Sequence, residues 1–137
     1  MPVRRITPQE AKTLMDEGYV YVDVRSIPEF EKGHPAGAYN VPLLHMGPAG
    51  MAPNGEFAAI MERAFPKDAK LIIGCKMGGR SAQASQMLEG MGYTHVVDQK
   101  AGFEGQPDNP GWSPSGLPVS TEAAADHTYE GLKGRAR

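Results

Sequence analysis

The chain has 137 residues, 40% of them apolar and 22% charged, and a formal net charge of -2 at pH 7. This length suits a single compact domain, and the composition is that of an ordinary globular protein. Scattered lysines and arginines, and the lack of a secretory signal or of an apolar run of ~20 residues, argue against nucleic-acid and membrane partners, so we expect a cytoplasmic protein.

The first half of the chain is predicted to alternate helices with short strands. Residues 7–18 begin with Thr-Pro-Gln-Glu, the spacing of a capping box, and predict a helix that ends at a glycine. Residues 19–24 are aromatic and β-branched with almost no alternation, which is typical of a strand buried on both faces. Residues 26–33 repeat the capping-box spacing and predict a short helix. A turn and a short strand are expected within 34–42, and a loop over the Gly- and Pro-rich residues 45–55.

The second half continues this alternation. Residues 57–65 have apolar side chains at i, i+3, i+4, i+7 and i+8, which predict an amphipathic helix. A buried strand is expected at 71–73, followed by a glycine-rich loop at 74–80. We expect Ser81 to cap the next helix. The core face of that helix is predicted to consist of Ala84, Met87, Leu88 and Met91.

A last buried strand at 95–97 leads into the Gly-, Pro- and Asp-rich stretch 101–116. Strands separated by helical segments predict an α/β fold with a central, mainly parallel β-sheet flanked by helices. We place the domain at residues 1–119. The small and polar residues 120–137 are expected to form a frayed or weakly docked C-terminal tail.

Cys75 is the single cysteine of the chain, which excludes an internal disulfide, a Cys-x-x-Cys pair and any multi-cysteine metal site. It follows the strand 71–73, and in open α/β sheets ligands collect at the carboxyl ends of the strands. The loop glycines allow backbone N–H groups to turn inward, the following helix presents its positive end, and Lys76 and Arg80 add positive charge. Such surroundings stabilise a thiolate and attract an anionic substrate. A lone cysteine can also be a small buried apolar residue, but the flanking charges and glycines favour a reactive one.

The pattern Cys75-x-x-Gly78-x-Arg80-Ser81 resembles the active-site loop of the rhodanese family. Two further blocks are similar to the family's terminal signatures. Residues 23–42 contain Asp-Val-Arg, Glu-Phe, Gly-His and Asn-Val-Pro in order, and residues 101–118 contain Ala-Gly-Phe-Glu-Gly, Gly-Trp and Gly-Leu-Pro. Together the matches extend from about residue 5 to residue 119.

This resemblance implies a rhodanese-like three-layer fold and a two-step sulfur transfer. The Cys75 thiolate would attack an anionic donor such as thiosulfate and become a persulfide, and cyanide or a cellular thiol, possibly on a protein, would then accept the sulfur. No metal and no organic cofactor is implied. Lys76 suits a small anion such as thiosulfate. The residues implied to bind the substrate are Lys76, Met77, Gly78, Gly79, Arg80 and Ser81.

Two alternatives remain open. Rhodanese-fold cysteine phosphatases and arsenate reductases have loops of the form Cys-x5-Arg, whereas four residues separate Cys75 from Arg80 here, and Gly74 rather than a histidine precedes the cysteine. The other alternative is a persulfide carrier or partner-binding module with low turnover, which would use the same thiol.

Several other polar and aromatic residues are interpreted as structural. Asp23, Arg25 and Glu29 are expected to fix neighbouring loops, with Arg25 pairing with Glu29. Trp112 and Phe103 are expected to pack the C-terminal loop over the core. The histidines show no ligand spacing with one another or with the cysteine, so a zinc site is not expected.

Overall fold

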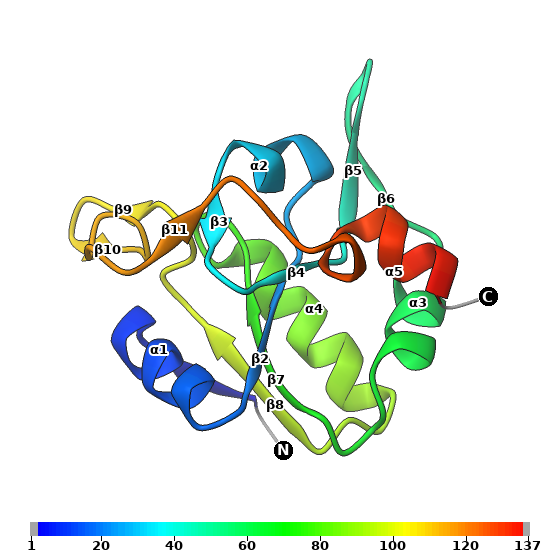
Figure 1. Cartoon of the computed structure of the whole chain (residues 1–137), viewed down its shortest axis with the longest axis horizontal. Helices are drawn as coiled ribbons and strands as arrows, with labels where there is room; N and C mark the ends of the chain where they lie inside the picture. The colour runs from blue at the N-terminus through cyan, green and yellow to red at the C-terminus, as the bar shows by residue number, and fades with distance from the viewer. Residues whose placement is uncertain (1–2, 136–137) are drawn as a thin grey trace.

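The computed structural model describes residues 3–135. A parallel sheet forms its centre (Figure 1), and the register of each neighbouring pair is parallel. In spatial order its strands are β1 (Arg4–Ile6), β8 (His95–Gln99), β7 (Lys70–Gly74), β2 (Val20–Asp23) and β4 (Tyr39–Asn40). The predicted α/β class with a central, mainly parallel sheet is therefore confirmed.

Helices lie against both faces of the sheet (Figure 1). They are α1 (Pro8–Asp16), α2 (Ile27–Lys32), α3 (Phe57–Ala64), α4 (Gly79–Gly90), the short 3-10 helix η1 (Ala125–His127) and α5 (Tyr129–Arg135). Among residues 3–135, no helix is both long enough and apolar enough to cross a lipid bilayer.

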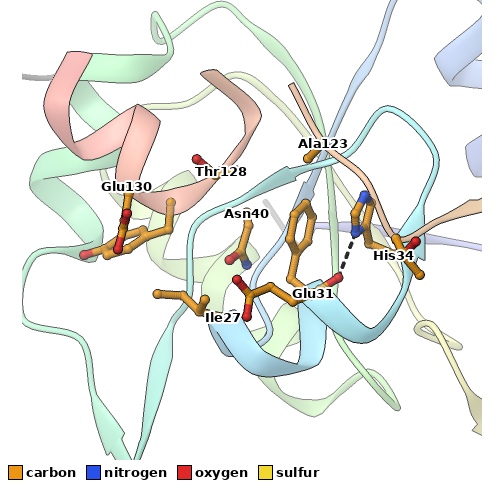
Figure 2. A pocket seen from close by; sticks show the side chains of 10 residues that line it. Ile27, Glu31, His34, Asn40, Ala123, Thr128 and Glu130 are labelled. Atoms are coloured by element: carbon orange, nitrogen blue, oxygen red, sulfur yellow. Dashed lines mark hydrogen bonds between the residues drawn. The ribbon is translucent and has the colours of Figure 1, made fainter. Parts of the chain in front are cut away.

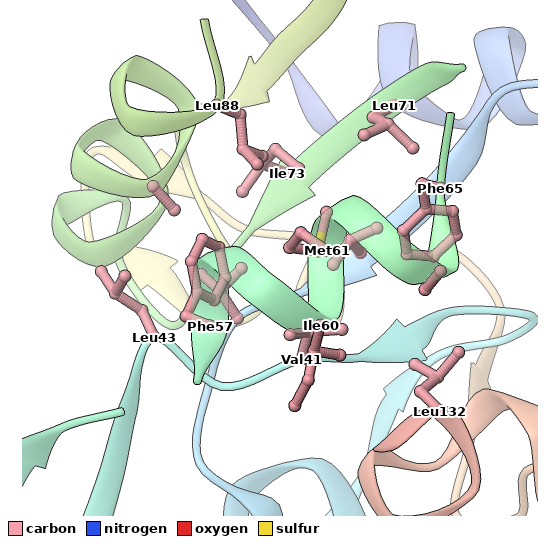
Figure 3. Packing of buried hydrophobic residues seen from close by; sticks show 14 of the residues in the cluster. Val41, Leu43, Phe57, Ile60, Met61, Phe65, Leu71, Ile73, Leu88 and Leu132 are labelled. Carbon is pink, nitrogen blue, oxygen red and sulfur yellow. The ribbon is translucent and has the colours of Figure 1, made fainter. Parts of the chain in front are cut away.

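The sheet is buried on both faces because alternate side chains of each strand enter different clusters. Tyr21 and Ile72 belong to the cluster beneath α1. Val22 and Ile73 belong to the second cluster, which α3, α4 and α5 cover. Figure 3 shows the side chains of these helices, such as Met61, Leu88 and Leu132, packed together with Ile73. Burial of each large aliphatic side chain contributes about 1.5–3 kcal/mol. This arrangement explains why residues 19–24 lack a polar–apolar alternation.

Both predicted capping boxes form. The Thr7 hydroxyl accepts a hydrogen bond from the backbone N–H of Glu10 (3.1 Å), and the Glu10 carboxylate accepts one from the N–H of Thr7 (3.0 Å). At the start of α2, the N–H and the hydroxyl of Ser26 both donate to Glu29 Oε1 (3.1 and 2.8 Å). These bonds satisfy N–H groups that the helix itself leaves without partners.

The predicted loop over 45–55 is wrong, because most of it forms an antiparallel hairpin of β5 (Leu44–Gly47) and β6 (Gly50–Pro53). Gly50 takes φ +108 at the turn, a conformation open to glycine. Met46 and Met51 lie opposite each other and are largely exposed, so the hairpin has little buried apolar surface. It projects away from the rest of the molecule (Figure 1).

Helix α4 begins earlier than predicted. Its N-cap is Gly78, with φ +105, so Ser81 lies inside the first turn and is not the cap. Ala84 and Leu88 are buried as expected, whereas Met87 is 38% exposed and is not part of the core.

Within the described residues the C-terminal segment packs against the domain, where a frayed or weakly docked tail was expected. Strand β11 (Val119–Ser120) pairs with β3 (His34–Pro35), and α5 places Tyr129 and Leu132 in the second cluster. These two apolar side chains are three residues apart and therefore lie on the same face of α5. A two-stranded ribbon, β9 (Gly105–Gln106) with β10 (Asn109–Pro110), lies within the predicted irregular stretch 101–116.

Candidate functional site

Cys75 follows β7 directly, at the carboxyl edge of the sheet, where the sequence placed it. Gly74 allows the strand to run closely past Tyr21, since a Cβ on Gly74 would collide with the Tyr21 hydroxyl. Burial raises the pKa of Tyr21 above its ordinary range, so this hydroxyl stays neutral beside the cysteine.

The sulfur of Cys75 lies in a small ring of polar groups. The Gly78 N–H donates to Sγ over 3.1 Å, and the thiol lies 3.5 Å from the Ser81 hydroxyl, which donates to the carbonyl of Gly78 (3.2 Å). Only 2% of the Cys75 residue is exposed, and its side chain also borders the apolar cluster beneath α4. A hydroxyl rotates freely, so Ser81 can turn its O–H toward a sulfur anion.

The remaining N–H groups of the loop are available for hydrogen bonding. Within residues 3–135, no hydrogen-bond acceptor is found for the backbone N–H groups of Lys76, Met77, Gly79, Arg80 and Ser81. The last three belong to the first turn of α4, the positive end of that helix. Unpaired N–H groups around a turn of this kind form an anion-binding concavity.

Residues from β1 and β8 support the loop from behind. Arg5 Nε donates to Asp98 Oδ2 (2.8 Å) and Arg5 Nη2 to the Gly78 carbonyl (3.4 Å). A Cβ on Gly78 would collide with the backbone carbonyl of Lys100. Sequence reasoning missed Arg5 and Asp98, because only the pairing of β1 with β8 brings residues 93 positions apart together.

A second support comes from the segment after β8. The N–H of Phe103 donates to the carbonyl of Cys75 (2.7 Å), and the N–H of Glu104 donates to the carbonyl of Lys76 (3.0 Å). Gln99 exchanges two hydrogen bonds with the backbone of Gly102, which takes φ +79 at this close approach. The block 101–105 of the sequence pattern therefore holds the cysteine loop through its backbone.

The ion-pair partner of Glu29 is Arg80. The expected pair of Glu29 with Arg25 does not form. The two guanidinium nitrogens of Arg80 lie 2.7 and 3.1 Å from the two carboxylate oxygens of Glu29. Partial burial opposes ionisation of Glu29, but hydrogen bonds from Arg80 and Ser26 outweigh it and lower the pKa of Glu29 to about 2. The same carboxylate raises the pKa of Arg80. Both groups are therefore charged near neutral pH.

Arg25 instead pairs with Asp23, and both are buried. The Arg25 guanidinium donates to Asp23 Oδ2 (2.7 Å) and to the carbonyl of Gly33 (2.6 Å), and it stacks 4.4 Å from the centroid of the Phe103 ring. Asn40 donates to the carbonyls of Asp23 and Arg25. These contacts join the end of β2 to the loops on either side of it.

A cavity of about 280 Å³, called here the loop-side cavity, lies beside the cysteine loop. Its lining residues are Arg25, Glu29, Lys32, Gly33, Lys76, Phe103 and Glu104. Lys76 Nζ lies 3.4 Å from Glu104, and Met77 is 52% exposed at the outer surface of the loop.

Another cavity, of about 260 Å³, lies between α2 and the C-terminal segment (Figure 2). His34 borders it with both ring nitrogens near backbone carbonyls: Nδ1 lies 2.7 Å from Phe30 O, and Nε2 lies 2.8 Å from Glu122 O. No residue of the cysteine loop lines this cavity. Across residues 3–135 there is no cluster of three or more His, Cys, Asp or Glu side chains that could hold a metal ion.

Trp112 is fully buried, and its indole N–H donates to the carbonyl of Pro118 (2.7 Å), so it packs the C-terminal loop as expected. Phe103 is only partly buried, and it lines the loop-side cavity.

Comparison with known proteins gives consistent results. The family model described as "Rhodanese-like domain" matches residues 7–106. "Thiosulfate sulfurtransferase 16, chloroplastic" of Arabidopsis thaliana is 37% identical over 109 residues, which are 80% of this chain and 86% of that protein. "Thiosulfate sulfurtransferase GlpE" of Haemophilus influenzae is 31% identical over 88% of this chain and 98% of that protein. The chain spans only 56% to 64% of the length of four further relatives.

A solved structure shares the architecture. The crystal structure of Rv0390 from M. tuberculosis superposes with a TM-score of 0.76 and 26% identity, covering 89% of this chain and all of that one.

Proposed function

The chain belongs to the rhodanese-like family of sulfurtransferases, and from this premise we propose that it moves sulfane sulfur from thiosulfate to a thiol or cyanide through a persulfide on Cys75. The observation that carries the proposal is the position of the Cys75 sulfur, 3.1 Å from the N–H of Gly78. The N–H groups of residues 76, 77 and 79–81 in the same loop have no acceptor in the described part of the chain.

In the first step, the Cys75 thiolate attacks the outer sulfur of thiosulfate. The S–S bond of the donor breaks, its electron pair leaves on sulfite, and Cys75 becomes a persulfide anion. The negative charge is carried from the cysteine sulfur to the transferred sulfur. Free N–H groups and the first turn of α4 stabilise that charge without moving, which is how preorganised donors accelerate such steps.

Lys76 and Arg80 have different parts in this proposal. The Lys76 side chain is about half exposed and forms an ion pair with the exposed Glu104. It can therefore turn toward an anionic donor. Arg80 is held at both nitrogens by Glu29, and we propose that it fixes the loop and adds to the positive field. An arginine committed in this way is poorly suited to grip a phosphate, which speaks against the phosphatase alternative.

The direct test is the mass of the intact protein after incubation with thiosulfate. We expect a gain of one sulfur, about 32 Da, that cyanide or dithiothreitol removes, as thiol–disulfide exchange chemistry requires. Cys75→Ser should fold normally, gain no mass and form no thiocyanate, because a hydroxyl forms no persulfide. Thiocyanate production by Cys75→Ser would overturn the proposal.

Rates separate an enzyme from a persulfide carrier. An enzyme should discharge the preloaded persulfide to cyanide at least as fast as its steady-state turnover. A persulfide that persists with both small thiols and cyanide would favour the carrier alternative.

A further inference from the structure

The loop-side cavity is larger than a small sulfur donor needs. Its volume is about 280 Å³. One water molecule needs only about 10–15 Å³ of such space, so the cavity has room for a compact organic molecule.

The cavity adjoins the reactive loop on one side. Lys76, the residue after Cys75, forms part of its wall, and so does Glu29, whose carboxylate holds Arg80 of the same loop. Phe103 also lines the cavity, with the Arg25 guanidinium stacked on its ring. A molecule in this cavity lies next to the loop without displacing the groups that surround the sulfur.

The charges in the wall leave one unpaired lysine. Arg25 is neutralised by Asp23, Glu29 by Arg80, and Lys76 by Glu104. Lys32, in the last turn of α2, has no hydrogen-bond or ion-pair partner within residues 3–135. Within residues 3–135, the lining of the cavity therefore combines the aromatic ring of Phe103 with one uncompensated positive charge, that of Lys32.

We propose that the loop-side cavity binds the sulfur acceptor and that Lys32 selects thiols that carry a carboxylate. This inference rests on the proposed sulfur transfer and names the substrate class of its second step. In that step the acceptor thiol attacks the outer sulfur of the Cys75 persulfide anion. A bond forms between the acceptor sulfur and the outer sulfur, the bond to Sγ breaks, and its electron pair returns to Cys75 as thiolate. The thiol proton ends on the persulfide product, so no oxidant or reductant is needed.

The experiment uses protein preloaded with thiosulfate and freed of excess donor. Discharge of the persulfide is timed by intact mass with three small thiols, which are 3-mercaptopropionate, 2-mercaptoethanol and cysteamine. They differ in the charge of the end remote from sulfur. The same measurements are made on Lys32→Gln, Lys32→Arg and, as a control for the loss of one positive charge, Lys12→Gln, which removes a partly exposed lysine of α1 that pairs with Asp16.

The measured quantity is the discharge rate for 3-mercaptopropionate divided by that for 2-mercaptoethanol. The ratio is compared between variants, so the difference in intrinsic reactivity between the two thiols cancels. We expect the ratio to fall about fivefold in Lys32→Gln, the size of one solvent-screened ion pair. The ratio should be retained in Lys32→Arg and Lys12→Gln. The rate at which cysteamine discharges the persulfide should rise in Lys32→Gln, because its positive charge is no longer repelled by Lys32.

An equal ratio in the wild type and Lys32→Gln would overturn the inference while leaving the proposed function intact. A protein that forms no persulfide with thiosulfate would overturn both. Loss of the ratio in Lys12→Gln as well as Lys32→Gln would show a nonspecific charge effect and would also overturn the assignment of Lys32.

Discussion

Glu29 has two roles in the molecule, because one carboxylate both caps α2 and holds the cysteine loop. Its Oε1 accepts hydrogen bonds from Ser26, and both of its oxygens accept from Arg80. The side chains of Glu29 and Arg80 are only 18% and 17% exposed, so solvent screens the pair weakly. Loss of the charge on Glu29 should therefore affect the fold more than loss of an exposed carboxylate.

The first prediction concerns Glu29→Gln and its pH dependence. At pH 7 the substitution leaves Arg80 without a counter-charge, and we expect the free energy of unfolding to fall by about 1–3 kcal/mol. The folded-state pKa of Glu29 is lowered from 4.5 to about 2, so its stabilisation is present above pH 4.5 and is lost as the pH falls toward 2. Urea titrations of both proteins should therefore converge between these pH values.

Glu10→Gln is the matched control, because Glu10 also closes a capping box but is exposed. Its effect at pH 7 should be smaller than that of Glu29→Gln. A difference between the wild type and Glu29→Gln that stays constant from pH 7 to pH 2.5 would contradict the assigned ion pair.

At the scale of single elements, the start of α4 depends on Gly78. Its φ of +105 is open to glycine, its N–H reaches the Cys75 sulfur, and its Cα faces the carbonyl of Lys100 too closely for a Cβ. Gly79, one residue later, is the first helical residue and has open space around the position of a Cβ.

The second prediction compares Gly78→Ala with Gly79→Ala. Gly78→Ala should lower the free energy of unfolding by more than about 1 kcal/mol and slow persulfide formation, because the loop must shift to relieve the collision. Gly79→Ala should leave stability unchanged or raise it by about 0.5–1 kcal/mol, since alanine is the better helix former. Urea titration and the rate of mass gain with thiosulfate check both. Equal stability of the two variants would show that Gly78 does not need its backbone conformation.

The sequence predicts local elements well and non-local pairings poorly. The capping boxes of α1 and α2, the buried strand β2 and the place of Cys75 after β7 all follow from patterns within a few residues. The ion-pair partner of Glu29 could not be predicted from such patterns. Arg25 is a nearby candidate in the sequence, whereas the actual partner, Arg80, is 51 positions away. The support of Gly78 by Arg5 depends likewise on the packing of β1 against β8. The hairpin β5–β6 was missed because its Gly and Pro content is typical of loops.

At the scale of the whole molecule, the two apolar clusters lie on opposite faces of one sheet and unfold together if the chain is a single cooperative unit. Trp112, the single tryptophan, reports on the cluster beneath α1. Leu132 lies in the other cluster, on α5, and is fully buried.

The third prediction uses these two positions. Leu132→Ala should lower the free energy of unfolding by about 2–5 kcal/mol, the usual effect of such a truncation in a packed core. The shift should be equal when followed by Trp112 fluorescence and by far-UV circular dichroism. Met46→Ala, which truncates a side chain that is 54% exposed on the hairpin, should change stability by less than about 0.5 kcal/mol.

A Leu132→Ala transition seen by circular dichroism and absent from Trp112 fluorescence would show that the C-terminal segment unfolds on its own. It would then be a separate unit resting on the sheet.

The pairing of β1 with β8 has a consequence for synthesis on the ribosome. Residues 4–6 leave the ribosome well before their partners, residues 97–99, and the carbonyl of Glu122 that His34 contacts is made later still. At about 5–20 residues per second, the first strand waits roughly 5–20 s for its neighbour. Growing chains should therefore stay protease-sensitive, and open to chaperones, until residues 95–99 have been made and have left the ribosome.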